Sequence, residues 1–259
     1  MWTALVVVLV SVVVTAVACV LLGRSRAHEQ SDDRDADSRG FLGAVVSGLF
    51  IVALAFYVVI VWEGNGAAGD NASREAAAVA DVYWQTSVMP QPQRDVIRGL
   101  LVEYPKLVAD KEWPLLADGE SDGGTTATLN SLHAAVLSLP VTPDEVRSTR
   151  ERAMERLREI TDLRRERLDS ASGLDDTGHL MLIGTIVGAV AMVVFPLLIG
   201  FTARRRHVLQ ICLTTAILAF VCVLCLGMTQ PFDGMLRVDP EPFTNLTEEL
   251  AAIPVEENR

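Results

Sequence analysis

The side chains best suited to chemistry are few in this chain, and they form no recognised catalytic pattern. Cys222 and Cys225 have the spacing of a redox pair, but they stand in an apolar run with nothing beside them to lower a thiol pKa. The histidines lack metal-site spacing and are scattered at positions 28, 133, 179 and 207. No phosphate-binding loop, HExxH motif or nucleophile elbow occurs. We therefore predict no enzyme activity, no bound metal and no cofactor, and we interpret the cysteines as small packing residues.

Four uncharged apolar runs are the elements that would have to position any functional residue. They cover residues 2–22, 41–62, 180–202 and 208–228. About 20 helical residues cross a bilayer core of about 30 Å, and a helix satisfies its own backbone hydrogen bonds there. The first run lacks a basic leader and a convincing cleavage site, so we expect an uncleaved span. The runs predict a multi-pass protein of the cell membrane, with the lipid bilayer as its partner.

The runs divide the chain into four parts. Residues 1–62 form a first transmembrane hairpin, 63–177 a polar block, 178–229 a second hairpin and 230–259 a C-terminal tail. The polar block has 21 Asp and Glu against 13 Lys and Arg, a net charge of −8. An acidic surface repels nucleic acid and anionic lipid, so we predict neither as a partner of the block. The Ala-, Val- and Arg-rich composition is typical of a bacterial protein.

The polar block has the periodicity of helices and no strand pattern. Helix formers and apolar positions at helical spacing predict helices near 72–88, 93–110, 129–137 and 143–172. The predicted core stripe is Val96, Leu100 and Tyr104, together with Trp113. The predicted fold is all-α, with four transmembrane helices and an antiparallel helical bundle inserted between the second and third spans. The three glycines in 63–69 allow either a flexible joint or one long helix that continues from the second span.

Arginines in two short loops indicate the orientation of the spans. Arg24 and Arg26 follow the first span, and the loop between the last two spans contains Arg204, Arg205 and Arg206. Lys and Arg near span ends are retained on the cytoplasmic side. This interpretation places both loops inside and the polar block outside the cell.

Several segments resemble an uncharacterised bacterial membrane family with a bestrophin-like domain. The resemblance covers about residues 40–250, and its short motifs occur in the same order as the predicted spans and helices. These segments are Gly48–Trp62, Arg74–Ala76, Ala80–Tyr83, Tyr104–Val108, Glu112–Leu115, Arg150–Leu168, Gln230–Gly234 and Leu236–Val238.

The chain is more distantly similar to the bestrophins themselves, which are pentameric anion channels. Their second span lines the pore, which implies Val52 and Phe56 as candidates for an apolar pore neck. Pro231, Phe232 and Asp233 are similar to the bestrophin motif beyond the last span. Bestrophins have an acidic calcium-binding segment near this motif. The corresponding part of this chain has few acidic residues, so no calcium site is predicted. The likeness also implies a cytoplasmic bundle, which the arginines contradict, and the sequence leaves both orientations open.

Two functions remain open. The first is a bestrophin-like, homo-oligomeric channel for an inorganic anion. The alternative is a non-conducting membrane sensor or scaffold whose bundle binds a partner. No span has a charged group or polar cavity of its own, so a pore would require several subunits.

Overall fold

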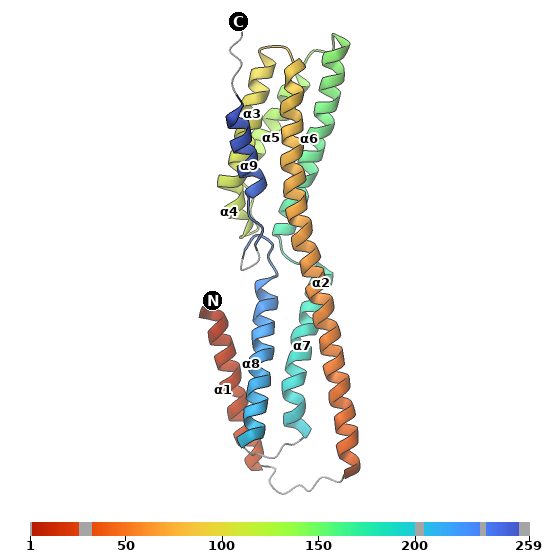
Figure 1. The fold of residues 1–259 in the computed structure, drawn as a ribbon, viewed down its shortest axis with the longest axis vertical. Helices are drawn as coiled ribbons and strands as arrows, with labels where there is room; N and C mark the ends of the chain where they lie inside the picture. Colours follow the sequence, from red (N-terminus) through yellow and green to blue (C-terminus); the bar gives the residue numbers. More distant parts are fainter. Residues whose placement is uncertain (1, 26–32, 200–204, 234–236, 254–259) are drawn as a thin grey trace. The chain divides into compact units, whose positions relative to one another are not determined.

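The chain folds into two compact helical units, each assembled from segments that are distant in sequence. The computed structural model describes residues 2–25, 33–199, 205–233 and 237–253. The first unit comprises Met1–Trp62 and Leu174–Thr229, and the second comprises Glu63–Gly173 and Gln230–Arg259. Every regular element of the described residues is helical, which confirms the all-α class (Figure 1).

The first unit contains the apolar helices. They are α1 (Trp2–Ser25), the first part of α2 (Asp33–Gln85), α7 (Asp176–Ile199) and α8 (Arg205–Gly227). Among the described residues, α2, α7 and α8 are long and apolar enough to cross a membrane, whereas α1 contributes the shorter apolar stretch Val6–Ala18. The chain is therefore built as a membrane protein.

Small residues allow large neighbours to pack closely within the first unit. A Cβ placed on Gly188 would lie 3.1 Å from Cδ2 of Phe50, and one on Gly43 would lie 3.1 Å from Cε1 of Phe195. A Cβ on Gly184 would meet nothing within 4 Å. Gly184 and Gly188 are four residues apart on α7, and only Gly188 therefore serves helix contact inside this chain.

Helix α2 continues without a break through the glycine-rich segment, so of the two alternatives the long helix is found. A Cβ on Gly64 or Gly66 would meet nothing within 4 Å, so close packing does not explain these glycines. Ala68 and Ala72 are fully buried nearby. Alanine is the best helix former, and the alanines that follow support the helix where glycine weakens it.

The second unit is a bundle with its own core. After α2 come the short helix η1 (Thr86–Val88), α3 (Gln93–Leu107), the π-helical turn η2 (Val108–Glu112), α4 (Trp113–Leu116), α5 (Gly123–Leu137), α6 (Asp144–Ala171) and α9 (Glu241–Ala252). Asp122 caps α5 because its Oδ2 accepts a hydrogen bond of 2.6 Å from the Thr125 backbone N–H. That bond lowers the pKa of Asp122.

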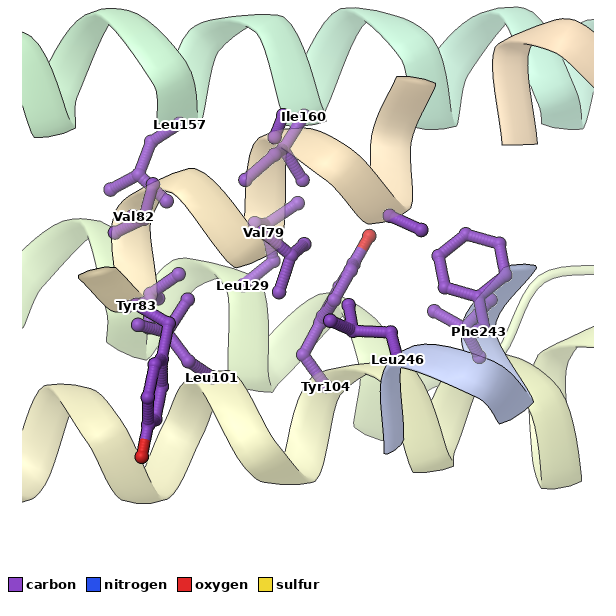
Figure 2. Packing of buried hydrophobic residues seen from close by; sticks show 14 of the residues in the cluster. Val79, Val82, Tyr83, Leu101, Tyr104, Leu129, Leu157, Ile160, Phe243 and Leu246 are labelled. Atoms are coloured by element: carbon purple, nitrogen blue, oxygen red, sulfur yellow. The ribbon is translucent and has the colours of Figure 1, made fainter. Parts of the chain in front are cut away.

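Side chains of α2, α3, α4, α5, α6 and α9 contribute to the core of the second unit. Figure 2 shows labelled side chains of α2, α3, α5, α6 and α9 within it. The predicted stripe on α3 is partly wrong: Val96 is 55% exposed and Leu100 is only partly buried. Ile97 and Leu101 are fully buried instead, with Tyr104. Both stripes keep helical spacing, so tertiary contacts with α5 and α9 decide which of the two faces inward.

Residues 230–259, separated as a tail by the sequence, belong to this second unit. Their helix α9 buries Phe243, Leu246 and Leu250 in the core. The helix is short and has few apolar residues, so its burial depends on the surface that α3 and η2 offer.

Candidate functional site

Four charged side chains from three elements meet in the interior of the second unit. Glu75, Glu112 and Arg167 have no exposed surface, and Arg164 is 7% exposed. Arg167 donates two hydrogen bonds to Glu75, from Nε to Oε2 at 3.0 Å and from Nη2 to Oε1 at 3.1 Å, and its Nη2 forms an ion pair with Glu112 Oε2 at 3.0 Å. Arg164 binds both oxygens of Glu112, with Nε 3.2 Å from Oε2 and Nη2 in contact with Oε1. These four residues form the ionic cluster, whose formal charge is zero.

Two hydroxyl groups extend the hydrogen bonding of the ionic cluster, in which Nη1 of Arg167 is buried without a hydrogen-bond partner among the described residues. Tyr104 donates to Glu75 Oε1 at 2.6 Å, and Arg164 Nη2 donates to Thr126 Oγ1 at 2.9 Å. Buried charges are tolerated only when paired and hydrogen-bonded in this manner. The cluster therefore ties α2, α3, α5, α6 and the π-helical turn together.

The pKa values within the site follow from burial and the paired charges. Burial alone lowers the pKa of Arg167, but Glu75 and the other partners raise it by more, so the guanidinium stays charged. Burial, followed by the neighbouring Glu75 charge, raises the pKa of Tyr104 well above its usual value. Tyr104 therefore remains a neutral donor.

Aromatic rings cover one side of the ionic cluster. The guanidinium carbon of Arg167 lies 5.5 Å from the ring centres of both Trp113 and Phe243. Trp113 also contacts Phe232 edge-to-face, with ring centres 5.2 Å apart. The indole N–H of Trp113 donates to the Val238 carbonyl at 3.1 Å, which attaches the chain after α8 to the bundle.

The π-helical turn helps to bring Glu112 and Trp113 into the site. A π turn holds one residue more than an α turn, so it rotates the face that follows it. Val108 is buried before the turn, and Glu112, Trp113 and Leu116 are buried after it. Such turns often occur at functional positions.

The ionic cluster was not predicted from the sequence, because charged side chains on a long helix usually lie in solvent. One signal was available: Leu157, Ile160, Arg164, Arg167 and Ala171 follow one another at three- or four-residue steps, and all are buried. Arginines at core positions of an amphipathic helix indicate buried acidic partners.

The two candidates for a pore neck lie on α2 in the first unit. Val52 is 52% exposed and Phe56 is 59% exposed, so neither is covered by helices of its own chain. Their side chains are one helical turn apart on one face. Tyr57, the next residue, is fully buried and donates to the Cys225 carbonyl at 2.5 Å.

The motif Pro231, Phe232 and Asp233 divides between the core and the surface. Pro231 and Phe232 are buried and Asp233 is exposed. The Pro231 carbonyl accepts a bond of 2.7 Å from the Val238 backbone N–H. Within the described ranges, no three metal-binding side chains come together at this motif or elsewhere.

The arginines that indicate orientation are described only in part. Arg24 lies in α1 and Arg205 begins α8. Arg206 is exposed. Arg26 and Arg204 lie outside the described residues.

A charged groove runs along α6 in the second unit, beside α2. Its cavity measures about 580 Å³, and side chains of both signs line it, including Arg74, Arg156 and Glu159. Arg156 pairs with Asp81 at 3.1 Å and with Glu159 at 2.7 Å, so the charges are largely matched within the chain. Such a surface favours solvent exposure over a strong anion site.

Comparison with known proteins identifies the family. A family model described as Bestrophin-like domain matches residues 9–243, most of the chain. No curated protein and no solved structure matches. Several segments that carry the sequence resemblance contribute residues to the ionic cluster or its hydrogen bonds. These residues, which contact one another, are Glu75, Tyr104, Glu112, Arg164 and Arg167.

Proposed function

The chain belongs to the bestrophin-like family, and we propose that it is a homo-oligomeric ion channel whose pore is lined by α2. In this proposal the four apolar helices α1, α2, α7 and α8 all cross the cell membrane. The bestrophin likeness implies an inorganic anion as the permeant ion.

The exposed face of α2 is the observation that carries this proposal. Val52 and Phe56 lie on it together with the small residues Ala44, Gly48 and Ala55. A Cβ on Gly48 would meet nothing within 4 Å, so contacts within the chain do not account for this glycine. Small residues on a membrane helix favour close approach of another helix, which here would belong to another subunit. In a ring of subunits, Val52 and Phe56 would form an apolar constriction of the kind that gates by dewetting.

Planar bilayer recordings with the purified full chain test this proposal. We expect wild-type protein to conduct, and Val52→Ala with Phe56→Ala to raise the single-channel conductance because the neck is wider. Leu180→Ala with Leu209→Ala is the matched control, since both leucines are exposed on other apolar helices. Silence of the wild type and of the double variant over a range of voltage and calcium would rule out the channel.

We also propose that the second unit lies outside the cell, as the arginines of the two loops predict. Ser121 is an exposed residue of this unit. In a chain without its own cysteines, Ser121→Cys should react with an impermeant thiol reagent in intact cells. Labelling only after lysis would reverse the orientation and agree with the cytoplasmic domain of bestrophins.

A membrane sensor or scaffold is the second candidate, and exposed apolar residues of the second unit favour it. Trp84 is 56% exposed, Val141 56% and Leu137 51%. Large exposed apolar side chains are a feature of partner-binding surfaces. Subunit counting in detergent separates the candidates, since a symmetric pentamer supports the channel and a monomer or dimer the scaffold.

A further inference from the structure

Every exposed large apolar side chain described in the second unit lies at one end of its bundle. At this end α2 and α5 finish, and η1, α3 and α6 begin (Figure 1). The short helix η1 contacts both α3 and α6, so the connection from α2 to α3 lies beside the start of α6. We call these exposed apolar residues the end patch: Trp84, Val88, Val96, Leu137 and Val141.

The core of the bundle is closed beneath the end patch without using it. Met89 and Leu139, one in each connection, are buried with 3% of their surface exposed. Trp84 touches Tyr83 edge-to-face, with ring centres 5.9 Å apart, and is still 56% exposed. Apolar side chains gathered on the surface of a water-exposed bundle mark a contact with a partner. The end patch is therefore available to another molecule.

Two arginines without an acidic partner belong to the same end. Arg98 donates from Nε to Thr86 Oγ1 at 2.7 Å, and its guanidinium carbon lies 5.3 Å from the ring centre of Tyr83. These contacts hold Arg98 beside the end patch. Within the described residues, neither Arg98 nor Arg150 takes part in an ion pair. Trp and Arg are enriched among the residues that dominate binding between proteins.

This end of the bundle also differs in net charge from the rest of the second unit. Residues 84–98 and 137–150 contain four Arg and three Asp or Glu, a net charge of +1. The rest of the unit contains 23 Asp and Glu against 11 Lys and Arg, a net charge of −12. Of the three acids, Asp95 and Asp144 already have an arginine nearby. Glu145 lies in the first turn of α6, where a helix N-terminus favours a carboxylate.

We infer that this end of the second unit binds an acidic segment of a partner protein. Apolar side chains of that segment cover the end patch, and its carboxylates pair with Arg98 and Arg150. Charge complementarity selects this occupant. A second copy joined end to end would place arginines against arginines, and an anionic lipid surface would meet a unit that is strongly acidic elsewhere. The inference rests on the second candidate function and specifies its partner, and it does not depend on the channel.

Peptide binding to the full chain tests this inference. The probes are two fluorescein-labelled amphipathic peptides of about 18 residues, or about five helical turns. Both have a leucine face, and the opposite face is glutamate in one peptide and glutamine in the other. With the chain in phosphatidylcholine nanodiscs, fluorescence polarisation should show severalfold tighter binding of the glutamate peptide. Empty nanodiscs give the background.

Variants assign the binding to this end of the bundle. Arg98→Gln with Arg150→Gln should remove the preference for the glutamate peptide, and Trp84→Ala with Val141→Ser should weaken both peptides severalfold. Arg158→Gln with Arg165→Gln is the matched control, because it removes the same charge from exposed positions further along α6. The control should keep the wild-type affinity. An unchanged thermal midpoint checks that each variant is folded.

Other occupants of the end patch give different results. Equal binding of the two peptides, or an affinity that both end variants leave unchanged, would overturn the inference. A smaller subunit count of the end variants in detergent would assign the end patch to contacts between copies instead. Binding of the chain to phosphatidylglycerol vesicles that the end variants abolish would assign it to lipid. Silence in bilayer recordings would overturn the channel and leave this inference standing.

Discussion

The two units of this protein bury different kinds of polar side chain. Every buried polar residue described in the first unit is a threonine: Thr15, Thr185 and Thr215. Each hydroxyl donates to the carbonyl four residues earlier, at 2.8 to 2.9 Å, so no donor is left open in an apolar unit. The second unit buries four full charges and joins five helices or turns through them.

The difference follows from the surroundings of each unit. A helix in lipid gains little from burying apolar surface, so close packing and self-satisfied hydroxyl groups hold the first unit together. A bundle in water gains from apolar burial, and its dense core can offset the cost of a paired ionic cluster. The first unit accordingly exposes large apolar side chains on every helix, including Leu21, Leu49, Leu180 and Leu209. The units should therefore respond differently to the same kind of substitution.

The largest expected effect comes from breaking the ionic cluster. Arg167→Met leaves Glu75 without its main partner in a buried site. The free energy of unfolding of the second unit should fall by about 3–5 kcal/mol. Urea titration of the full chain in detergent measures it, with the fluorescence of Trp113 followed after the other three tryptophans are replaced by phenylalanine. Arg165→Met is the matched control, because the Arg165–Asp162 pair is exposed and should matter little. Equal effects of the two variants would show that the cluster contributes nothing particular to stability.

A large-to-small substitution in the core should have the next largest effect. Leu101→Ala removes a fully buried side chain and should cost about 2–5 kcal/mol in the same titration. Leu100→Ala, at the partly buried neighbour, should cost less, and Val96→Ala should be close to neutral. In the first unit, Leu49→Ala alters an exposed side chain and should leave the unfolding of the bundle unchanged. A larger loss of unfolding free energy for Leu100→Ala than for Leu101→Ala would support the core stripe predicted from the sequence instead.

The smallest expected effect lies in the first unit, at its inter-helix hydrogen bond. Tyr57→Phe removes the donor to the Cys225 carbonyl and nothing else. Hydrogen bonds between membrane helices average about 0.6 kcal/mol, so the thermal midpoint in detergent should fall only slightly. A loss as large as that of Arg167→Met would contradict the contrast between the units.

The apolar and polar patterns of the sequence correctly predict helices over most of the chain. The ends of α3, α5 and α6 fall within a few residues of prediction or extend it, because capping and turn residues mark them. Helix α9 and the π-helical turn were not predicted. A short helix of moderate amphipathicity and a one-residue insertion leave no clear periodic signal.

Hydropathy and periodicity are local properties, so the amino-acid order is enough to predict an all-helical chain with membrane-length apolar runs. The burial of Arg164 and Arg167 beside an exposed Arg165 depends instead on how the helices pack. Three arginines within four residues look alike in a sequence. Their burial depends on Glu75, 92 positions from Arg167, and on Glu112, 52 positions from Arg164, and such pairings form only when the helices pack.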